Sequence, residues 1–245
     1  MAAKVTEHWT ELRCLAGGWE AKGISVMVEP NWSSYLRSTS VIDFHDAEVG
    51  ALAAELGAEG GPLEIAARSF YWVRDSIRHS VDHGDQQVTL SASDTLRYQT
   101  GLCYAKSHLL AAILRANKIP CGLVYQRLAI DDDGDAFCLH GLNAIWLDDF
   151  GWYRVDPRGD RPGITTKFEP PHEHLAFAPT RTGELILDEI FADPLPVVVN
   201  ALTGYSCMPE LCCHLPDLPS SVGFGQLAAD LTDQVLADDG ELGSE

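Results

Sequence analysis

One cysteine, one histidine and one aspartate are placed along the chain so that they could carry nucleophilic catalysis. Cys103 follows Gly101 and opens a run of strong helix formers, which predicts that Gly101 allows a tight turn and that the thiol lies at a helix N-terminus. The positive potential there and a nearby imidazole would favour a thiolate. His140 and Asp156 follow on two later strand-like runs, which could lie side by side. In such a triad the imidazole takes the thiol proton and the carboxylate orients the ring, so we predict acyl transfer through a thioester.

The sequence around these residues predicts the elements that position them. Apolar residues at helical spacing, bounded by capping residues and by Gly or Pro, predict a series of helices. The expected helices cover 46–56, 62–79, a short stretch that starts at Ser91 or Ser93 and stops before Gly101, and 103–117. Three strand-like runs follow at 121–130, 137–147 and 152–156, separated by turn sequences. We therefore expect an α+β fold in which the Cys103 helix packs against an antiparallel sheet that carries His140 and Asp156.

The two ends of the chain are expected to be extensions of one catalytic domain. Residues 1–35 would form an N-terminal extension packed on the core, and residues 36–205 would form the catalytic domain. Residues 206–245 would be a C-terminal extension that ends in a mobile acidic tail. The stretch after Asp156 is rich in Pro and Gly with short apolar runs, and predicts loops and ancillary elements.

Composition limits the partners and the compartment. With 36 acidic and 17 basic side chains the net charge is −19, which repels phosphate backbones and anionic lipid headgroups. We therefore expect neither nucleic acid nor a membrane as a partner. No segment is apolar over the length that a signal peptide or a membrane span requires, so a cytoplasmic protein is expected. The seven cysteines are an odd number in a long chain and predict mostly free thiols.

Several segments, in order, resemble a known family. The helix sequence FYWVRDSIRHSVDHG is similar to the helix that precedes the core in bacterial members, and GLCYAKSHLLAAILRANKIPCGLVYQ resembles the transglutaminase-like core motif. HGLNAIWLDDFGWYRVDPRGD resembles its second half, with the histidine at the head of a strand and the aspartate in a Trp-x-x-x-Asp-Pro segment. The resemblance covers roughly 36–160 and is to bacterial transglutaminase-like cysteine proteases. It implies a papain-like cysteine-proteinase fold with Cys103, His140 and Asp156 as the catalytic residues.

Two departures from the family pattern concern the site. Animal transglutaminases place a tryptophan near the oxyanion, upstream of the nucleophile, whereas this chain has none there; Tyr98 and Gln99 are possible substitutes. The backbone N–H of Cys103 is the oxyanion donor that the helix start itself provides. The second departure is HGLNAIW in place of the common His-Ala-Trp.

The reaction that we expect first is hydrolysis of an amide or related acyl bond in a peptide, a protein or a small acyl substrate, with no cofactor. Peptidase, amidase, deamidase and amine-acceptor transglutaminase all share the thioester, and the loops that build the substrate groove decide between them. An alternative of another class is a non-enzymatic member of the same fold that only binds peptide or protein.

Two clusters of possible metal ligands are interpreted as ordinary structure. Cys207, Cys212, Cys213 and His214, to which His172 and His174 could add, lack the paired spacing of zinc sites and are expected to be core or surface residues. The Asp-rich run 131–135 lacks the downstream Glu of a calcium loop and is expected to be a solvated turn. No metal site is therefore predicted.

Several polar residues near the triad are given structural roles. His108 lies on another side of the helix from Cys103 and is expected to be structural. Lys106 and Ser107 are expected to face solvent or, less simply, the rim of the site. Arg158 and Asp160 follow Asp156 and are expected to order its loop by ion pairing.

Overall fold

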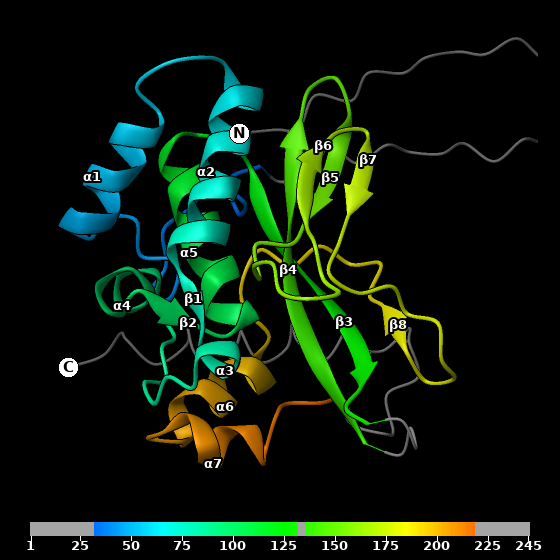
Figure 1. The fold of residues 1–245 in the computed structure, drawn as a ribbon. Coiled ribbons are helices and arrows are strands. Elements are labelled where there is room, and N and C mark those ends of the chain that lie inside the picture. The colour runs from blue at the N-terminus through cyan, green and yellow to red at the C-terminus, as the bar shows by residue number, and fades with distance from the viewer. Residues whose placement is uncertain (1–31, 132–135, 219–245) are drawn as a thin grey trace, which may run out of the picture. The chain divides into compact units, whose positions relative to one another are not determined.

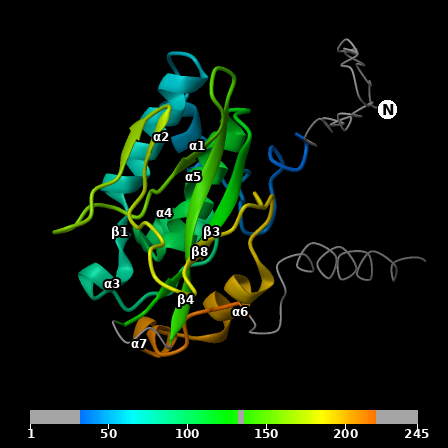
Figure 2. The same cartoon turned by 90° about the vertical axis from the view of Figure 1, so that its right-hand side faces the viewer.

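The structure is a computed structural model that describes residues 32–131 and 136–218. The helices and strands are, in chain order, α1 (Ala47–Leu56), α2 (Pro62–Ser76), β1 (Arg78–His79), α3 (Ser80–His83), α4 (Ala92–Tyr98), β2 (Thr100–Gly101), α5 (Cys103–Ala116), β3 (Cys121–Ala129), β4 (Phe137–Leu147), β5 (Gly151–Val155), β6 (Lys167–Glu169), β7 (His172–His174), β8 (Leu185–Ile186), α6 (Pro196–Gly204) and α7 (Met208–Cys212). Figures 1 and 2 show α1, α2, α4 and α5 as one layer against the sheet that contains β3 and β4. The expected α+β class is confirmed.

The main sheet is antiparallel, with the strand order β5-β4-β3-β8. β3 pairs with β4 over the whole length of β3, from Cys121 opposite Ile145 to Ala129 opposite Phe137. β5 pairs only with the second half of β4, from Asn143 to Leu147. In the described part of the chain, no strand therefore pairs with the first half of β4 on the side away from β3. This half of β4 contains His140, the predicted catalytic histidine.

The helix that bears Cys103 is the centre of the hydrophobic core. Every residue of α5 from Cys103 to Arg115 is buried, because α1, α2, α4 and the sheet surround it. Its small and branched apolar side chains, such as Ala112 and Ile113, are fully buried, and burial of a large one contributes about 1.5–3 kcal/mol. Asn117 ends the helix and ties it to α1 by donating its amide to the carbonyls of Ile113 and Ala53. Packing along its length and these bonds at its C-terminal end together fix the position of α5, and with it the position of Cys103 at its start.

The capping residues that the sequence predicted for the helices near the site are confirmed for α1 and α4. Asp46 caps α1 by accepting from two backbone N–H groups, and Ser91 caps α4 through the N–H of Asp94. α2 ends at Ser76, earlier than predicted, because β1 then pairs with β2 in parallel. The predicted reason for Gly101 is wrong: a Cβ atom there would lie 2.9 Å from Ala105 Cβ, so close packing rather than a turn requires the glycine.

The region after β5 is more regular than the predicted loops. It contains β6, β7, β8, α6 and α7, and the described chain ends beside β4, where the N–H of Leu139 donates to the carbonyl of Pro216 at 2.7 Å. Most of the predicted N-terminal extension, the acidic tail and the turn at 132–135 lie outside the described residues, so the domain boundaries stay predictions. None of the described helices is long and apolar enough to cross a membrane.

Candidate active site

The structure brings Cys103, His140 and Asp156 together at the N-terminus of α5. His140 Nε2 lies 2.8 Å from Asp156 Oδ2, which leaves the ring nitrogen Nδ1 for its hydrogen bond with Cys103. The neighbouring N–H of Gly141 donates to Cys103 Sγ at 3.4 Å. All three side chains are buried. The arrangement provides a thiol, an imidazole and a carboxylate in the order that proton transfer requires.

The imidazole of His140 is held in its protonated form. Burial opposes the charge, but the negative charge of Asp156, the electrostatic interaction with Cys103 and hydrogen bonds to both groups raise the pKa of His140 to about 10. Burial also opposes the charge of Asp156, but the charge of His140 and hydrogen bonds from His140 and from two backbone N–H groups lower the pKa of Asp156. The raised pKa of His140 therefore places a positive charge between the Asp156 carboxylate and the sulfur of Cys103.

The start of α5 also leaves backbone donors free. The first hydrogen bond within the helix is from the N–H of Lys106 to the carbonyl of Leu102, so the N–H groups of Cys103, Tyr104 and Ala105 have no acceptor in the helix. These donors lie at the same helix end as the thiol and could stabilise an oxyanion. The side chains of Tyr98 and Gln99, which the sequence raised as substitutes for the missing tryptophan, are exposed.

His140 and Asp156 lie at slightly different points of their strands than predicted. His140 is an interior residue of β4 rather than its head, and Asp156 follows the last residue of β5. The Asp156 carboxylate is completely buried and accepts from the backbone N–H groups of Arg158 and Ala176, each at 3.1 Å. These bonds orient the carboxylate toward His140.

Gly141 was missed as a residue of the site, although the sequence marked HGLNAIW as unusual. A Cβ atom on Gly141 would lie 2.9 Å from Tyr104 Cδ1 and 3.3 Å from Tyr104 Cα. The Tyr104 ring cannot move aside easily because it is buried and its hydroxyl donates to the carbonyl of Leu139. Glycine therefore allows β4 to approach the start of α5 closely enough for its N–H to reach Cys103 Sγ.

We expect Gly141→Ala to lower turnover by about 10- to 100-fold, because overpacking here displaces β4, and with it His140, from Cys103. Steady-state kinetics and urea unfolding would measure the loss of activity and of stability. The control is Gly204→Ala at the end of α6, where an added Cβ has no neighbour within 4 Å. Equal activity of the two variants would contradict this role of Gly141.

A partly buried ion pair and an aromatic ring hold the loop after Asp156, as the sequence indicated for Arg158. Arg158 Nη1 lies 2.8 Å from Asp82 Oδ2, whereas Asp160 acts through a hydrogen bond, accepting from the N–H of Thr166. The Arg158 guanidinium lies over the ring of Phe177, and this ring packs edge-on against His140 with centroids 5.0 Å apart. Phe177 thus covers the imidazole, and no sequence signal pointed to it.

The predicted exposure of Lys106 and Ser107 is wrong. Lys106 is completely buried, and its ammonium group donates to the carbonyls of Ile77 and Arg74 at the end of α2. Burial, together with the positive charge of Arg158, lowers the pKa of Lys106 to about 7. Ser107 is buried as well. His108 has the expected structural role, since its Nδ1 lies 2.8 Å from the carbonyl of Leu90.

Burial of Lys106 predicts a pH effect on stability. Between its folded pKa of about 7 and its ordinary value of 10.5, the unfolded chain holds a proton that the folded chain has lost. The contribution of Lys106 to the free energy of unfolding therefore rises with pH in this window, by at most about 1.4 kcal/mol per pH unit.

Urea unfolding of the native chain and of Lys106→Met at several pH values tests this. We expect the native chain to gain stability relative to the variant from about pH 7 to about pH 10. Lys167→Met, at a half-exposed lysine of β6, should show no such trend. Parallel curves for the native chain and Lys106→Met would contradict the lowered pKa of Lys106.

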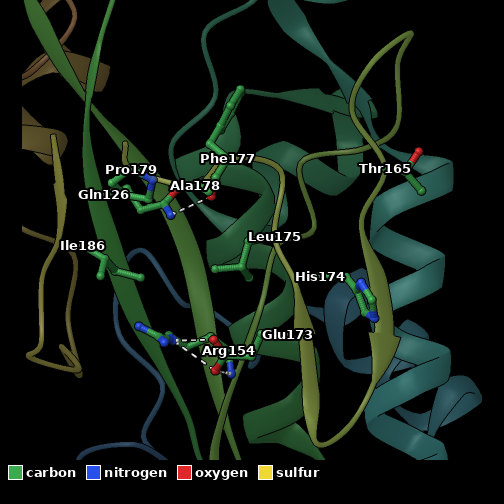
Figure 3. A pocket seen from close by; sticks show the side chains of 10 residues that line it. All are labelled: Gln126, Arg154, Thr165, Glu173, His174, Leu175, Phe177, Ala178, Pro179 and Ile186. Atoms are coloured by element: carbon green, nitrogen blue, oxygen red, sulfur yellow. Dashed lines mark hydrogen bonds and ion pairs between the residues drawn. The ribbon is translucent and has the colours of Figure 1, made fainter. Parts of the chain in front are cut away.

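A pocket of about 400 Å³ lies beside the triad and is drawn in Figure 3. Its apolar lining includes Leu175, Phe177 and Ile186, and its polar lining includes Gln126. Gln126 lies opposite His140 in the β3–β4 register, and its amide donates to the carbonyl of Phe177 at 3.0 Å. The pocket therefore shares Phe177 with the surroundings of His140.

The cysteines near the C-terminus do not gather around a common centre. Cys207 precedes α7, Cys212 and Cys213 are exposed, and His214 stacks on Tyr205. His174 lies on β7 and pairs with Glu169. No group of three or more possible metal ligands occurs among residues 32–131 and 136–218, and the six cysteines described there are free thiols.

Comparison with known proteins gives a family and several solved structures. Residues 50–157 match the model of the transglutaminase-like superfamily. A candidate cysteine protease from Cytophaga hutchinsonii is similar with a TM-score of 0.42 and 18% identity, over 54% of this chain and 44% of that chain. The periplasmic domain of TgpA from Pseudomonas aeruginosa, bound to ethylmercury, is similar with a TM-score of 0.40 and 20% identity, over 51% of this chain and 47% of that chain. The matched region is thus less than half the length of these structures. Comparison with curated proteins gives no match.

The family match spans the Cys103 helix α5 and the strands β3, β4 and β5 of the antiparallel sheet on which α5 packs. Over residues 50–157, less than half of its length, the chain is similar to the transglutaminase-like superfamily.

Proposed function

We propose that this chain is a cysteine hydrolase that cleaves an amide or related acyl bond through a thioester on Cys103. The observation that carries the proposal is the buried contact of His140 with both Asp156, at 2.8 Å, and Cys103 at the free end of α5. A histidine with only a structural role would not need a buried carboxylate on one side and a thiol at a helix N-terminus on the other. The protonation of His140 supports an ion pair that is ready to react.

The proposed reaction has two steps that share one proton carrier. The Cys103 sulfur attacks the carbonyl carbon, the C–S bond forms, and the N–H groups at the start of α5 stabilise the oxyanion. The C–N bond then breaks as His140 gives its proton to the leaving amine. In the second step His140 takes a proton from water, the oxygen attacks the thioester, and the C–S bond breaks to release the acid.

The proposed substrates are peptides, proteins or small acyl compounds, and water is the proposed acceptor. Nucleic acid is not a proposed partner, because the net charge of −19 repels phosphate. An amine could replace water in the second step, which would make the chain a transglutaminase. A purely peptide-binding protein would bind peptide beside Cys103 without forming a thioester.

Intact-protein mass spectrometry with a panel of activated acyl esters and peptide amides tests the proposal. We expect an acyl adduct that maps to Cys103 and disappears in water with release of the acid. Added amine that appears in the product would point to transamidation instead. Turnover without an adduct on Cys103, or no adduct with any donor, would contradict the proposed mechanism.

A further inference from the structure

Three alternate residues of β4, on the edge that faces away from β3, contact three different parts of the molecule. The N–H of Leu139 donates to the carbonyl of Pro216 at 2.7 Å, and the N–H of Gly141 donates to Cys103 Sγ at 3.4 Å. Asn143, two residues further along, pairs with Val155 of β5. Cys103 thus contacts the edge of β4 at Gly141, between Pro216 on one side and β5 on the other.

The segment from Leu215 to Leu218 is held on this edge by specific contacts. Asp217 accepts from Arg127 Nε and Nη2, each at 2.7 Å, in a bidentate ion pair. Arg127 lies opposite Leu139 in the β3–β4 register. Pro216 is buried, and the two leucines pack against the core. One backbone hydrogen bond to the edge of β4 and separate partners for the side chains are contacts that an extended peptide also makes when it adds to a sheet edge.

The geometry of the edge places such a peptide within reach of the thiol. Successive residues of a strand rise about 3.4 Å, so the N–H groups of Leu139 and Gly141 are about 7 Å apart along the strand. A peptide that places one carbonyl on Leu139 therefore places a carbonyl about two residues away beside Cys103. We propose that the edge of β4 from Leu139 to Gly141 docks an extended polypeptide acyl donor, and that Leu215–Leu218 occupies this edge as a competing ligand.

The docking position also has a preference for proline. The carbonyl of Leu139 already accepts from the Tyr104 hydroxyl, so it does not need an N–H from the docked peptide. Proline has no N–H to leave unpaired, and Pro216 occupies the position. With Arg127 beside it, the edge favours a proline followed by an acidic residue. The inference rests on the proposed function for its acyl-donor role, whereas the docking itself rests only on these contacts.

The test uses the full chain and the alkylation of Cys103 by iodoacetamide, followed by peptide mapping. Asp217→Ala removes the bidentate ion pair, and we expect Cys103 to react about fivefold faster because the segment leaves the edge more often. Asp193→Ala is the matched control, because it removes the exposed pair with Arg37 away from β4. Hydrolysis of a panel of proline-containing peptides should rise by a similar factor in Asp217→Ala only.

A second measurement uses a blocked synthetic peptide with the sequence of residues 214–218, His-Leu-Pro-Asp-Leu. Added to Asp217→Ala, this peptide should slow the alkylation of Cys103, and versions with Ala for Pro or Asn for Asp should slow it less. If Cys103 forms a thioester but neither Asp217→Ala nor the peptide changes its alkylation, the docking edge is wrong and the proposed function stands. If the peptide protects Cys103 but no acyl donor forms a thioester, the docking edge is supported and the proposed function is wrong.

Discussion

Cys103→Ala should lower the turnover of acyl substrates by about 10³-fold or more, because it removes the nucleophile. The fold should persist, since the variant deletes one buried sulfur atom from a helix that is otherwise packed on every side. Residual turnover would come only from the donors at the start of α5. Kinetics on a responsive acyl substrate and urea unfolding would measure both properties.

A second thiol provides the control for this variant. Cys213 is exposed, so Cys213→Ala tests whether the loss of any accessible thiol affects the assay. We expect its turnover to equal that of the native chain. Turnover by Cys103→Ala close to the native rate would show that this thiol is not the nucleophile.

His140→Ala should have the second largest effect, a loss of about 10²-fold or more, because the thiol loses its proton acceptor and the leaving group its donor. Asp156→Asn should lose less. The amide oxygen can still accept from His140 and from the N–H of Ala176, but the amide nitrogen would face the N–H of Arg158, which now donates to Asp156 Oδ1. The ring stays oriented while its positive charge is stabilised less.

Rates and unfolding curves for these two variants, measured side by side, separate orientation from charge. A folded Asp156→Asn chain with a partial loss would support the proposed roles. An equally complete loss in both variants would mean that the carboxylate does more than orient and stabilise the imidazolium.

The elements nearest to Cys103 could be predicted because their signals are local. A glycine before a run of good helix formers and a proline after it predict the position of α5 directly. The strand pairing followed from two short turns between apolar runs. α6 could not be predicted in this way, because the valines after Pro196 favour strands locally, and the helix forms where Val198 becomes completely buried.

The surroundings of the triad depend on contacts between distant parts of the chain. Lys106 looked like a solvent-facing residue of a helix, and only the position of α2 shows that its ammonium group binds carbonyls in the interior. Phe177 and Pro216 reach the site through loops whose paths no periodicity determines. The sequence could therefore predict that Cys103, His140 and Asp156 lie together, but not which residues cover them or that the edge of β4 lies beside Cys103.

The pH dependence of Cys103 alkylation tests the central claim, the ion pair between Cys103 and His140, most directly. The pKa of His140 is raised from its ordinary value of 6.5 to about 10. Its imidazolium therefore persists up to about pH 10, and the ion pair is lost only as the pH rises through that value. A free cysteine, by contrast, titrates near about 8.5. Iodoacetamide labelling between about pH 4 and pH 9, followed by peptide mapping, should therefore show substantial reaction of Cys103 at pH 6 and a much slower reaction at that pH in His140→Ala. Labelling that begins only above about pH 8, with the same profile in the native chain and in His140→Ala, would contradict the ion pair and favour a protein that binds peptides without reacting with them.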